Sequence, residues 1–294
     1  MKTILLAGGT GFIGRKLEIT LVNQGYSVVI LSRNPKRINE FFWNPSKKEI
    51  DFKALENVTA IINLCGANIG ERRWSEKRKA ELLNSRIEPT QFLASLIPQL
   101  PILESYISAS GISCYGFDSL TKIYTETDPF GQDYLSQLVK QWENASDLFN
   151  DKCRVVKMRT AVVLDLNEGA LQKIIAPIKW GIGSPLGDGN QIMPWVYIDD
   201  LTNSFLFAVQ NPIEGAFNCV GGNDSNKNFT RKIARCLKKS FWFPNVPSFL
   251  LKLIFGEMSD LVLKGVHVSN HKFSATGFKF QYSKIEEIFQ VKST

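Results

Sequence analysis

Residues 3–14 read Thr-Ile-Leu-Leu-Ala-Gly-Gly-Thr-Gly-Phe-Ile-Gly, and this stretch decides the fold. Its first five residues are mostly apolar, as in a strand that is covered on both faces. Glycines follow at positions 8, 11 and 14, and apolar residues then recur at helical spacing up to Gly25, where a glycine commonly ends a helix. The sequence therefore predicts a strand, a glycine-rich turn and a helix in direct succession.

The glycines of this turn are suited to binding a dinucleotide. The first permits a tight turn, the second leaves room for a pyrophosphate, and the third lets helix and strand pack closely. Backbone amides at the start of the helix then face the phosphates. A turn that serves only the fold is the alternative. The predicted cofactor contacts in this corner are Gly8, Thr10, Gly11, Phe12, Ile13 and Gly14.

The end of the second predicted strand indicates which dinucleotide is bound. Folds that select NAD usually place an acidic residue there for the ribose hydroxyls. This chain has Ser32 and Arg33 instead, a hydroxyl and a planar cation that suit a 2′-phosphate. NADP is therefore the predicted cofactor, with NAD as the alternative.

Short apolar runs alternate with helical patterns through the first two thirds of the chain, which is typical of a parallel sheet. We expect an α/β fold: a Rossmann-type doubly wound parallel sheet with a small, mostly helical C-terminal domain on the substrate side. Strands are predicted at 3–7, 27–31, 60–64, 105–108 and 155–158. Helices are predicted at 74–85, 88–97, 134–150 and 199–209.

The distribution of prolines and glycines along the chain indicates two domains. An NAD(P)-binding Rossmann domain is predicted over residues 1–221, with an excursion to the substrate side at about 166–195. Prolines and glycines separate short helical patterns after that point, so residues 222–294 are predicted as a C-terminal substrate-side domain.

Composition argues against several classes of partner. The formal net charge is +7, but no run of like charges resembles a nucleic-acid-binding or membrane-binding arm. The five cysteines form no CxxC pair, and His267 and His271 have no adjoining metal-ligand partner, so no metal site is expected. No apolar stretch reaches the length of a membrane span. We expect a cytoplasmic protein that binds a small molecule, and neither nucleic acid nor membrane.

Short motifs follow one another along nearly the whole chain. They are Gly8 to Gly14, Asn63 to Asn68, Arg73-Trp74, Ser85-Arg86, Ser108 to Ser110 before Tyr115-Gly116, Trp142-Glu143, Arg159-Thr160, Gly187 to Asp200, and Val246-Pro247 through Gly256-Glu257 to Gly277-Phe278. In order and spacing they resemble the extended and atypical short-chain dehydrogenase/reductase (SDR) superfamily, in its epimerase-family branch of nucleoside-diphosphate-sugar epimerase-like proteins with a characteristic C-terminal domain. The resemblance implies further cofactor contacts from Leu64, Cys65, Gly66, Ala67 and Ser108.

The resemblance also implies an NADP(H)-dependent oxidoreductase or epimerase-like enzyme that acts on a small carbonyl or hydroxyl substrate. Tyr134 and Ser110 are its candidate catalytic residues. An SDR tyrosine normally has a lysine four residues later, but this chain has Leu138 there, and Gly111 stands at the usual Ser/Thr position. Lys140 lies on another face of the helix. A non-catalytic NADP(H)-binding sensor that has lost the Tyr-Lys relay is therefore the alternative.

Two further features bear on substrate and assembly. Sugar-nucleotide epimerases often carry an arginine for the substrate diphosphate where this chain has Met193, and a thioether cannot make charge-assisted contacts. A sugar nucleotide is thus one substrate class among several small carbonyl or hydroxyl compounds. Superfamily relatives commonly dimerise, which makes a homodimer a candidate assembly.

Overall fold

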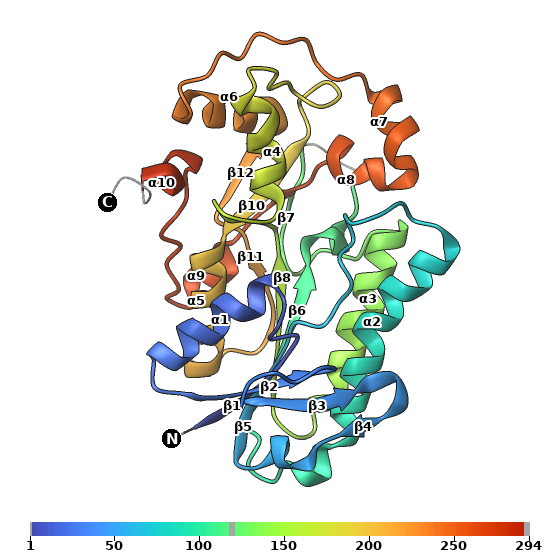
Figure 1. The fold of residues 1–294 in the computed structure, drawn as a ribbon, viewed down its shortest axis with the longest axis vertical. Helices are drawn as coiled ribbons and strands as arrows, with labels where there is room; N and C mark the ends of the chain where they lie inside the picture. Colours follow the sequence, from blue (N-terminus) through green and yellow to red (C-terminus); the bar gives the residue numbers. More distant parts are fainter. Residues whose placement is uncertain (1, 118–120, 291–294) are drawn as a thin grey trace.

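The computed structural model describes residues 2–117 and 121–290, and its centre is an eight-stranded sheet in the order β11-β8-β6-β5-β1-β2-β3-β4 (Figure 1). Every pair of neighbours is parallel except β3 and β4. The strands are β1 (Thr3–Ala7), β2 (Ser27–Ser32), β3 (Glu40–Asn44), β4 (Glu49–Ile50), β5 (Val58–Asn63), β6 (Ser105–Gly111), β8 (Arg154–Thr160) and β11 (Gly215–Cys219). The predicted doubly wound parallel sheet is confirmed, and β3, β4 and β11 are additions to it.

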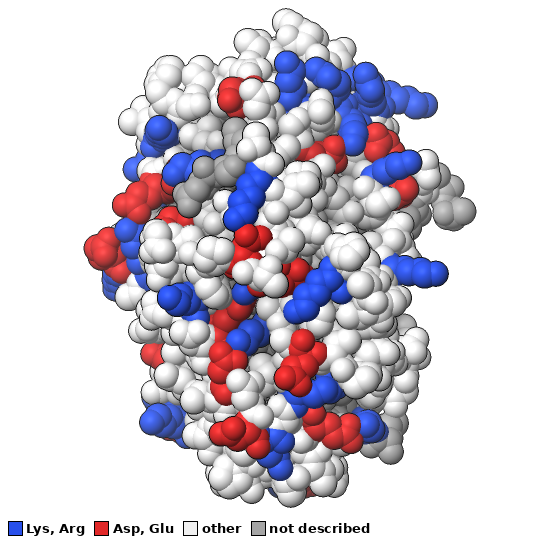
Figure 2. Space-filling model, turned by 180° about the vertical axis from the view of Figure 1, so that it is seen from behind, with Lys and Arg blue, Asp and Glu red and all other residues white. Residues whose placement is uncertain are grey.

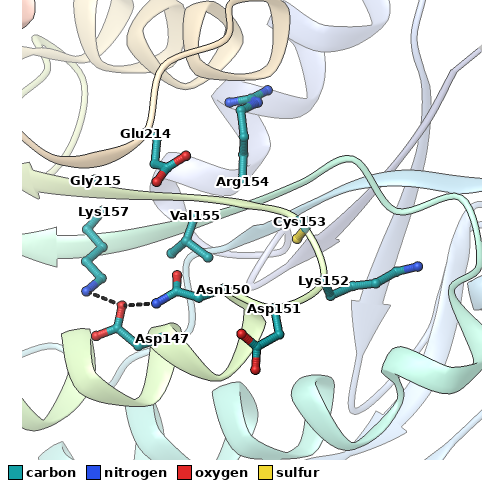
Figure 3. A pocket seen from close by; sticks show the side chains of 10 residues that line it. All are labelled: Asp147, Asn150, Asp151, Lys152, Cys153, Arg154, Val155, Lys157, Glu214 and Gly215. Carbon is teal, nitrogen blue, oxygen red and sulfur yellow. Dashed lines mark hydrogen bonds and ion pairs between the residues drawn. The ribbon is translucent and has the colours of Figure 1, made fainter.

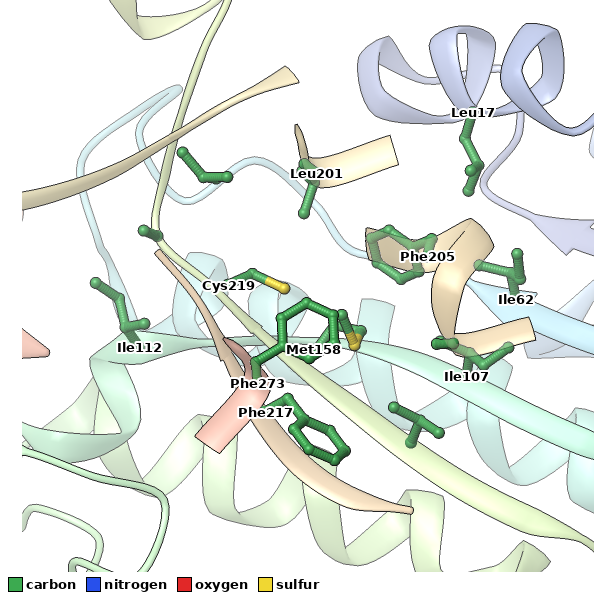
Figure 4. Close-up of a cluster of buried hydrophobic side chains, with 14 of the residues drawn as sticks. Leu17, Ile62, Ile107, Ile112, Met158, Leu201, Phe205, Phe217, Cys219 and Phe273 are labelled. Carbon is green, nitrogen blue, oxygen red and sulfur yellow. The ribbon is translucent and has the colours of Figure 1, made fainter. Parts of the chain in front are cut away.

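Two pairs of helices flank this sheet, α1 (Phe12–Asn23) with α5 (Ile198–Gln210) and α2 (Glu76–Ser95) with α3 (Tyr134–Ser146). Figure 1 shows the pairs on opposite sides of the strands. Leu17 of α1 and Phe205 of α5 are fully buried against the sheet residues Ile62, Ile107 and Met158 (Figure 4). The same cluster includes Ile4 and Leu6 of β1, so it holds α1 against the sheet and the glycine turn between β1 and α1 in place.

The prediction of separate helices at 74–85 and 88–97 was wrong. One helix, α2, runs through Pro89, which is buried. Proline removes one backbone hydrogen bond, and packing of a buried helix face can offset that loss. The helix predicted at 134–150 ends earlier, because the 3₁₀ turn η5 (Asp147–Phe149) follows α3.

A smaller three-stranded sheet contains β9 (Val162–Leu164), β10 (Ile192–Tyr197) and β12 (Gly222–Ser225). Helices α4 (Ala170–Lys179), α6 (Asn226–Cys236) and α10 (Ile285–Gln290) contribute buried side chains to the same core. The remaining elements are β7 (Ile123–Tyr124), β13 (His267–Val268), α7 (Ser248–Phe255), α8 (Asp260–Leu263), α9 (His271–Ala275) and the 3₁₀ turns η1 (Pro45–Lys47), η2 (Phe52–Leu55), η3 (Ile97–Gln99), η4 (Ile112–Tyr115) and η6 (Gly256–Ser259). The C-terminal region is thus mainly helical.

The charges of the surface are mixed. On the face shown in Figure 2, Lys and Arg alternate with Asp and Glu over much of the molecule, and basic side chains gather near one end. Among the described residues, no helix combines the length and apolar character that a membrane span needs.

The close backbone contact at Gly14 yields a stability prediction. A Cβ atom added at Gly14 would lie 2.5 Å from the Gly8 carbonyl oxygen and 2.5 Å from the Gly9 Cα. Gly14→Ala should therefore lower the free energy of unfolding by about 1–3 kcal/mol, since backbone on both sides has to shift. Urea denaturation measures it. Gly70→Ala is the matched control, because its nearest neighbour is 3.7 Å away; equal effects of the two variants would contradict the packing argument.

Candidate functional site

The glycine turn lies at the carboxyl end of β1, at the edge of the sheet where α/β folds bind ligands. Gly8 has a φ of 79°, and its carbonyl accepts a hydrogen bond from the Gly11 amide at 3.1 Å. A Cβ atom at Gly8 would lie 2.9 Å from the Leu64 carbonyl carbon, so the turn and the loop after β5 touch through their backbones. No side chain of the described residues caps the start of α1. Its first amides are therefore available to an anion.

A cavity of about 450 Å³ lies beside the turn at the end of β2. It brings the predicted Thr10, Ser32 and Arg33 together with residues that sequence reasoning missed. Its lining consists of Thr10, Arg15, Ser32, Arg33, Asn34, Lys36, Arg37 and Glu40. The missed residues Asn34, Lys36 and Arg37 follow Arg33 closely in the sequence, and that proximity is the signal that could have found them.

The cations of this cavity differ in how far they are neutralised. Arg37 is paired with Glu18 at 2.9 Å and with Glu40 at 2.7 Å, and its guanidinium holds the pKa of Glu40 below the usual value. Arg33 and Lys36 form no ion pair within the part of the chain that the structure describes. Two uncompensated cations beside a serine hydroxyl suit a phosphate group.

The loop after β5 is held rigidly. The buried Asn63 side chain accepts a hydrogen bond from the Cys65 amide at 3.0 Å and donates to Thr90 and Tyr106. The Ala67 amide donates to the Ser85 hydroxyl at 2.9 Å, and its carbonyl accepts from Arg86 at 3.1 Å. The predicted contacts Leu64 to Ala67 thus lie in a fixed loop against α2. Ser108 is buried, and its hydroxyl donates to the Ala109 carbonyl.

Tyr134 begins α3 directly after the capping residue Asp133. Its hydroxyl donates to the Lys79 carbonyl oxygen at 3.0 Å, and its ring is tilted against Trp74 with centroids 5.5 Å apart. Burial raises the pKa of Tyr134, while Arg86 and Lys79 oppose that shift. The phenol is therefore neutral at pH 7 in this arrangement. Leu138, at the position of the absent lysine, is buried one turn further along α3.

Ser110 belongs to a buried polar cluster with Glu143 and Arg159. Its hydroxyl donates to Glu143 Oε1 at 2.6 Å, and Arg159 donates to the same carboxylate through Nε at 2.8 Å and Nη2 at 2.9 Å. All three side chains are buried. The proton of Ser110 is committed to Glu143, so the hydroxyl has only acceptor capacity left for another group.

The C-terminal region meets α2 beside Tyr134. Arg73 donates to the Leu253 and Ile254 carbonyl oxygens at the end of α7, and the Lys79 ammonium pairs with Glu257 at 2.9 Å. Lys79 therefore takes part in both contacts. Its carbonyl oxygen accepts the hydrogen bond from the Tyr134 hydroxyl, and its ammonium pairs with Glu257.

A second cavity, of about 580 Å³, lies at the opposite edge of the sheet (Figure 3). Arg154 and Gly215, the first residues of β8 and β11, line it, and Lys157 pairs there with Asp147 at 2.6 Å. Ligands of open α/β sheets bind at the carboxyl ends of strands, and this cavity is at the amino ends. Among the described residues, no cluster of His, Cys, Asp and Glu is arranged to hold a metal.

The buried cluster around Glu143 yields a second stability prediction. Glu143→Ala leaves the Arg159 guanidinium buried without an opposite charge and should lower the free energy of unfolding by about 3–5 kcal/mol. Ser110→Ala is the matched control, since it removes one hydrogen bond but keeps the ion pair, and should cost about 1–3 kcal/mol. Chemical denaturation of both variants measures the difference. If Glu143→Ala lowers the free energy of unfolding no more than Ser110→Ala does, the result contradicts a buried ion pair between Glu143 and Arg159.

Comparison with known proteins adds two family models and several relatives. The model of the NAD dependent epimerase/dehydratase family matches residues 4–219, and a domain of unknown function (DUF1731) matches residues 246–290. The chain is 33% identical over 289 residues to epimerase family protein SDR39U1 of Mus musculus, which covers 96% of both chains.

Two solved structures are similar over nearly the whole chain. Human epimerase family protein SDR39U1, solved with NADPH, superposes with a TM-score of 0.89 at 32% identity, covering 98% of each chain. The nucleoside-diphosphate sugar epimerase from Corynebacterium glutamicum superposes with a TM-score of 0.80 at 26% identity, covering 98% of this chain and 57% of that one. With its fold, its glycine turn and the family model in agreement, the chain belongs to the NAD dependent epimerase/dehydratase family.

Proposed function

We propose that this protein binds NADP(H) and is an SDR-type oxidoreductase or epimerase-like enzyme for a small carbonyl or hydroxyl substrate. One observation carries the proposal: the uncapped start of α1 adjoins a cavity in which Arg33 and Lys36 have no carboxylate partner among the described residues. Together these features fit a pyrophosphate followed by a 2′-phosphate. The human relative SDR39U1, solved with NADPH, supports this choice of cofactor.

The same cavity argues for NADP over NAD, which stays the alternative. Its acidic residue, Glu40, is neutralised by Arg37 and also accepts the Lys36 amide at 2.7 Å. Glu40 therefore presents little negative charge to a phosphate. The remaining contacts that we propose come from Gly8 to Gly14 in the turn after β1, from Leu64 to Ala67 in the loop after β5, and from Ser108 in β6.

The proposed proton carrier is Tyr134. Bound NADP(H) would supply hydride transfer at its nicotinamide ring, and a nearby acid or base has to move the substrate proton. The Tyr134 hydroxyl can do so once it leaves the Lys79 carbonyl, to which it donates now. The proposed role of Ser110 is that of a hydrogen-bond acceptor, since its proton is held by Glu143.

The substrate class remains broad in this proposal. The Corynebacterium glutamicum relative is a nucleoside-diphosphate sugar epimerase, which favours a sugar nucleotide. Met193 in β10 favours a substrate without a diphosphate, because its thioether offers no positive charge. A small uncharged carbonyl or hydroxyl compound can exchange hydride with NADP(H) and needs no positive charge at position 193.

Specific observations favour a second candidate, a non-catalytic NADP(H) sensor. Leu138 replaces the relay lysine and is buried, and both candidate catalytic hydroxyls donate to protein oxygens. A sensor would bind the cofactor tightly and turn nothing over. The two candidates share cofactor binding and differ in the need for Tyr134.

Cofactor choice is tested through Arg33. Arg33→Ala should raise the dissociation constant for NADPH about 10- to 100-fold, because it removes charge-assisted bonds to the 2′-phosphate. NADH, which lacks that phosphate, is the control ligand and should bind the variant and the wild type alike. Isothermal titration calorimetry measures both. Equal losses for the two ligands would contradict the placement of the 2′-phosphate.

The two functional candidates are separated by Tyr134→Phe. The variant should retain NADPH affinity and lose at least about 100-fold in turnover of NADPH with a responsive carbonyl compound, since only the proton carrier is removed. NADPH absorbance at steady state is the measurement. Wild-type protein that binds NADPH yet oxidises it with no member of a broad carbonyl panel favours the sensor.

A further inference from the structure

Arg86 stands apart from the other buried arginines of the chain. Arg78, Arg86 and Arg159 are 3%, 8% and 4% exposed. Arg78 pairs with Glu71 and Glu81, and Arg159 pairs with Glu143. Within residues 2–117 and 121–290, Arg86 has no carboxylate partner: its Nη1 and Nη2 donate to the Leu82 and Ala67 carbonyls, and its Nε has no partner at all.

A buried guanidinium without an opposite charge is energetically unfavourable, so its presence needs a physical reason. Burial lowers the pKa of Arg86 to about 10, which still leaves the side chain charged at pH 7. Carbonyl dipoles satisfy two of its nitrogens but supply no net negative charge. The positive charge therefore acts on its surroundings almost without compensation.

Arg86 lies directly behind the loop after β5. A Cβ atom at Gly66 would be only 2.9 Å from Arg86 Cζ, so the loop backbone rests on the guanidinium. The guanidinium also lies 5.0 Å from the centre of the Trp142 ring. Trp142 is one turn beyond Leu138 on α3, and α2 packs against α3. Arg86 thus places a cation between α2 and α3, where Leu138 stands in place of the relay lysine.

The position of this loop relates Arg86 to one half of a dinucleotide. In the sheet, β2 with Ser32 and β5 with the loop lie on opposite sides of β1. A dinucleotide in this fold lies across the strand ends, so that its adenosine half and its nicotinamide half fall on opposite sides of the crevice. With the 2′-phosphate at Ser32 and Arg33, the nicotinamide half belongs on the side of Arg86.

We infer that Arg86 is a positioning residue that supplies the positive charge of the absent relay lysine and makes the site select NADPH over NADP⁺. The inference rests on the proposed function. The phosphates of the two forms are the same, so their attraction to Arg86 cancels in a comparison. The nicotinamide ring is neutral in NADPH and carries one positive charge in NADP⁺, and only the latter is repelled by the guanidinium.

The test is the ratio of the dissociation constants for NADP⁺ and NADPH in the full chain, measured by calorimetry. We expect the wild type to bind NADPH at least about tenfold more tightly, which is the effect of one charge about 12 Å away at an effective dielectric constant of about 20. Arg86→Met and Arg86→Gln should bring the ratio close to one, and Arg86→Lys should keep it. Arg78→Met is the matched control, because it removes a buried arginine whose charge is already paired.

The results that would overturn the inference differ from the result that would overturn the proposed function. Equal binding of both forms by the wild type overturns the inference without any variant, and so does an unchanged ratio in a neutral variant that circular dichroism shows to be folded. If Arg86→Lys, which keeps the charge, brings the ratio close to one, the inference is also overturned. The geometry of the guanidinium, and not its charge, would then be what matters. If the wild type binds neither form, the proposed function itself fails. If neutral variants do not fold, the wild-type ratio and Arg86→Lys decide.

Discussion

Three backbone segments meet at the glycine turn without room for a side chain between them. Gly14 of α1 rests on Gly8 and Gly9, and Gly8 rests on Leu64. These contacts bring the first amides of α1 to the loop after β5, and the parallel pairing of β1 with β2 puts the end of β2 at the same edge of the sheet. The proposed dinucleotide site depends on that arrangement, since the groups that we propose for it come from all three places.

The two ends of the site differ in how their polar groups are used. At the end of β2, where we propose the adenosine half, Arg33 and Lys36 have no carboxylate partner in the described part of the chain. At the other end, Tyr134 donates to Lys79 and Ser110 donates to Glu143. A phosphate can therefore approach Arg33 and Lys36 without breaking an ion pair, whereas the proposed proton transfer by Tyr134 would require its hydroxyl to give up the bond to Lys79.

The sequence was sufficient for the parts of the fold that depend on local patterns. The unit of β1, the glycine turn and α1, and the four further predicted strands, follow from apolar runs and from glycine spacing. Among the strands that were missed, β10 does read mostly apolar, Ile-Met-Pro-Trp-Val-Tyr, but others have no such pattern. For example, β12 reads Gly-Asn-Asp-Ser and has no buried residue, so its pairing with β10 rather than its side chains makes it a strand.

The same limit applied to the candidate site. The position of Ser32 and Arg33 beside the glycine turn could be predicted, because in this fold the end of β2 lies next to the end of β1. Glu143 and Arg159 are 16 residues apart and meet only because β6, β8 and α3 bring them together. The carboxyl partner of Ser110 was therefore invisible in the sequence, and so was the absence of a carboxylate beside Arg86 among the described residues.

Lys79 couples the C-terminal region to the candidate proton carrier. Its ammonium binds Glu257, and its carbonyl accepts the Tyr134 hydroxyl. Nearby, Arg73 donates to two carbonyls at the end of α7, where a helix leaves such groups unpaired. The ion pair with Glu257 and the hydrogen bond from Tyr134 thus meet at one residue of α2, so the C-terminal region is anchored at the same residue that holds the phenol.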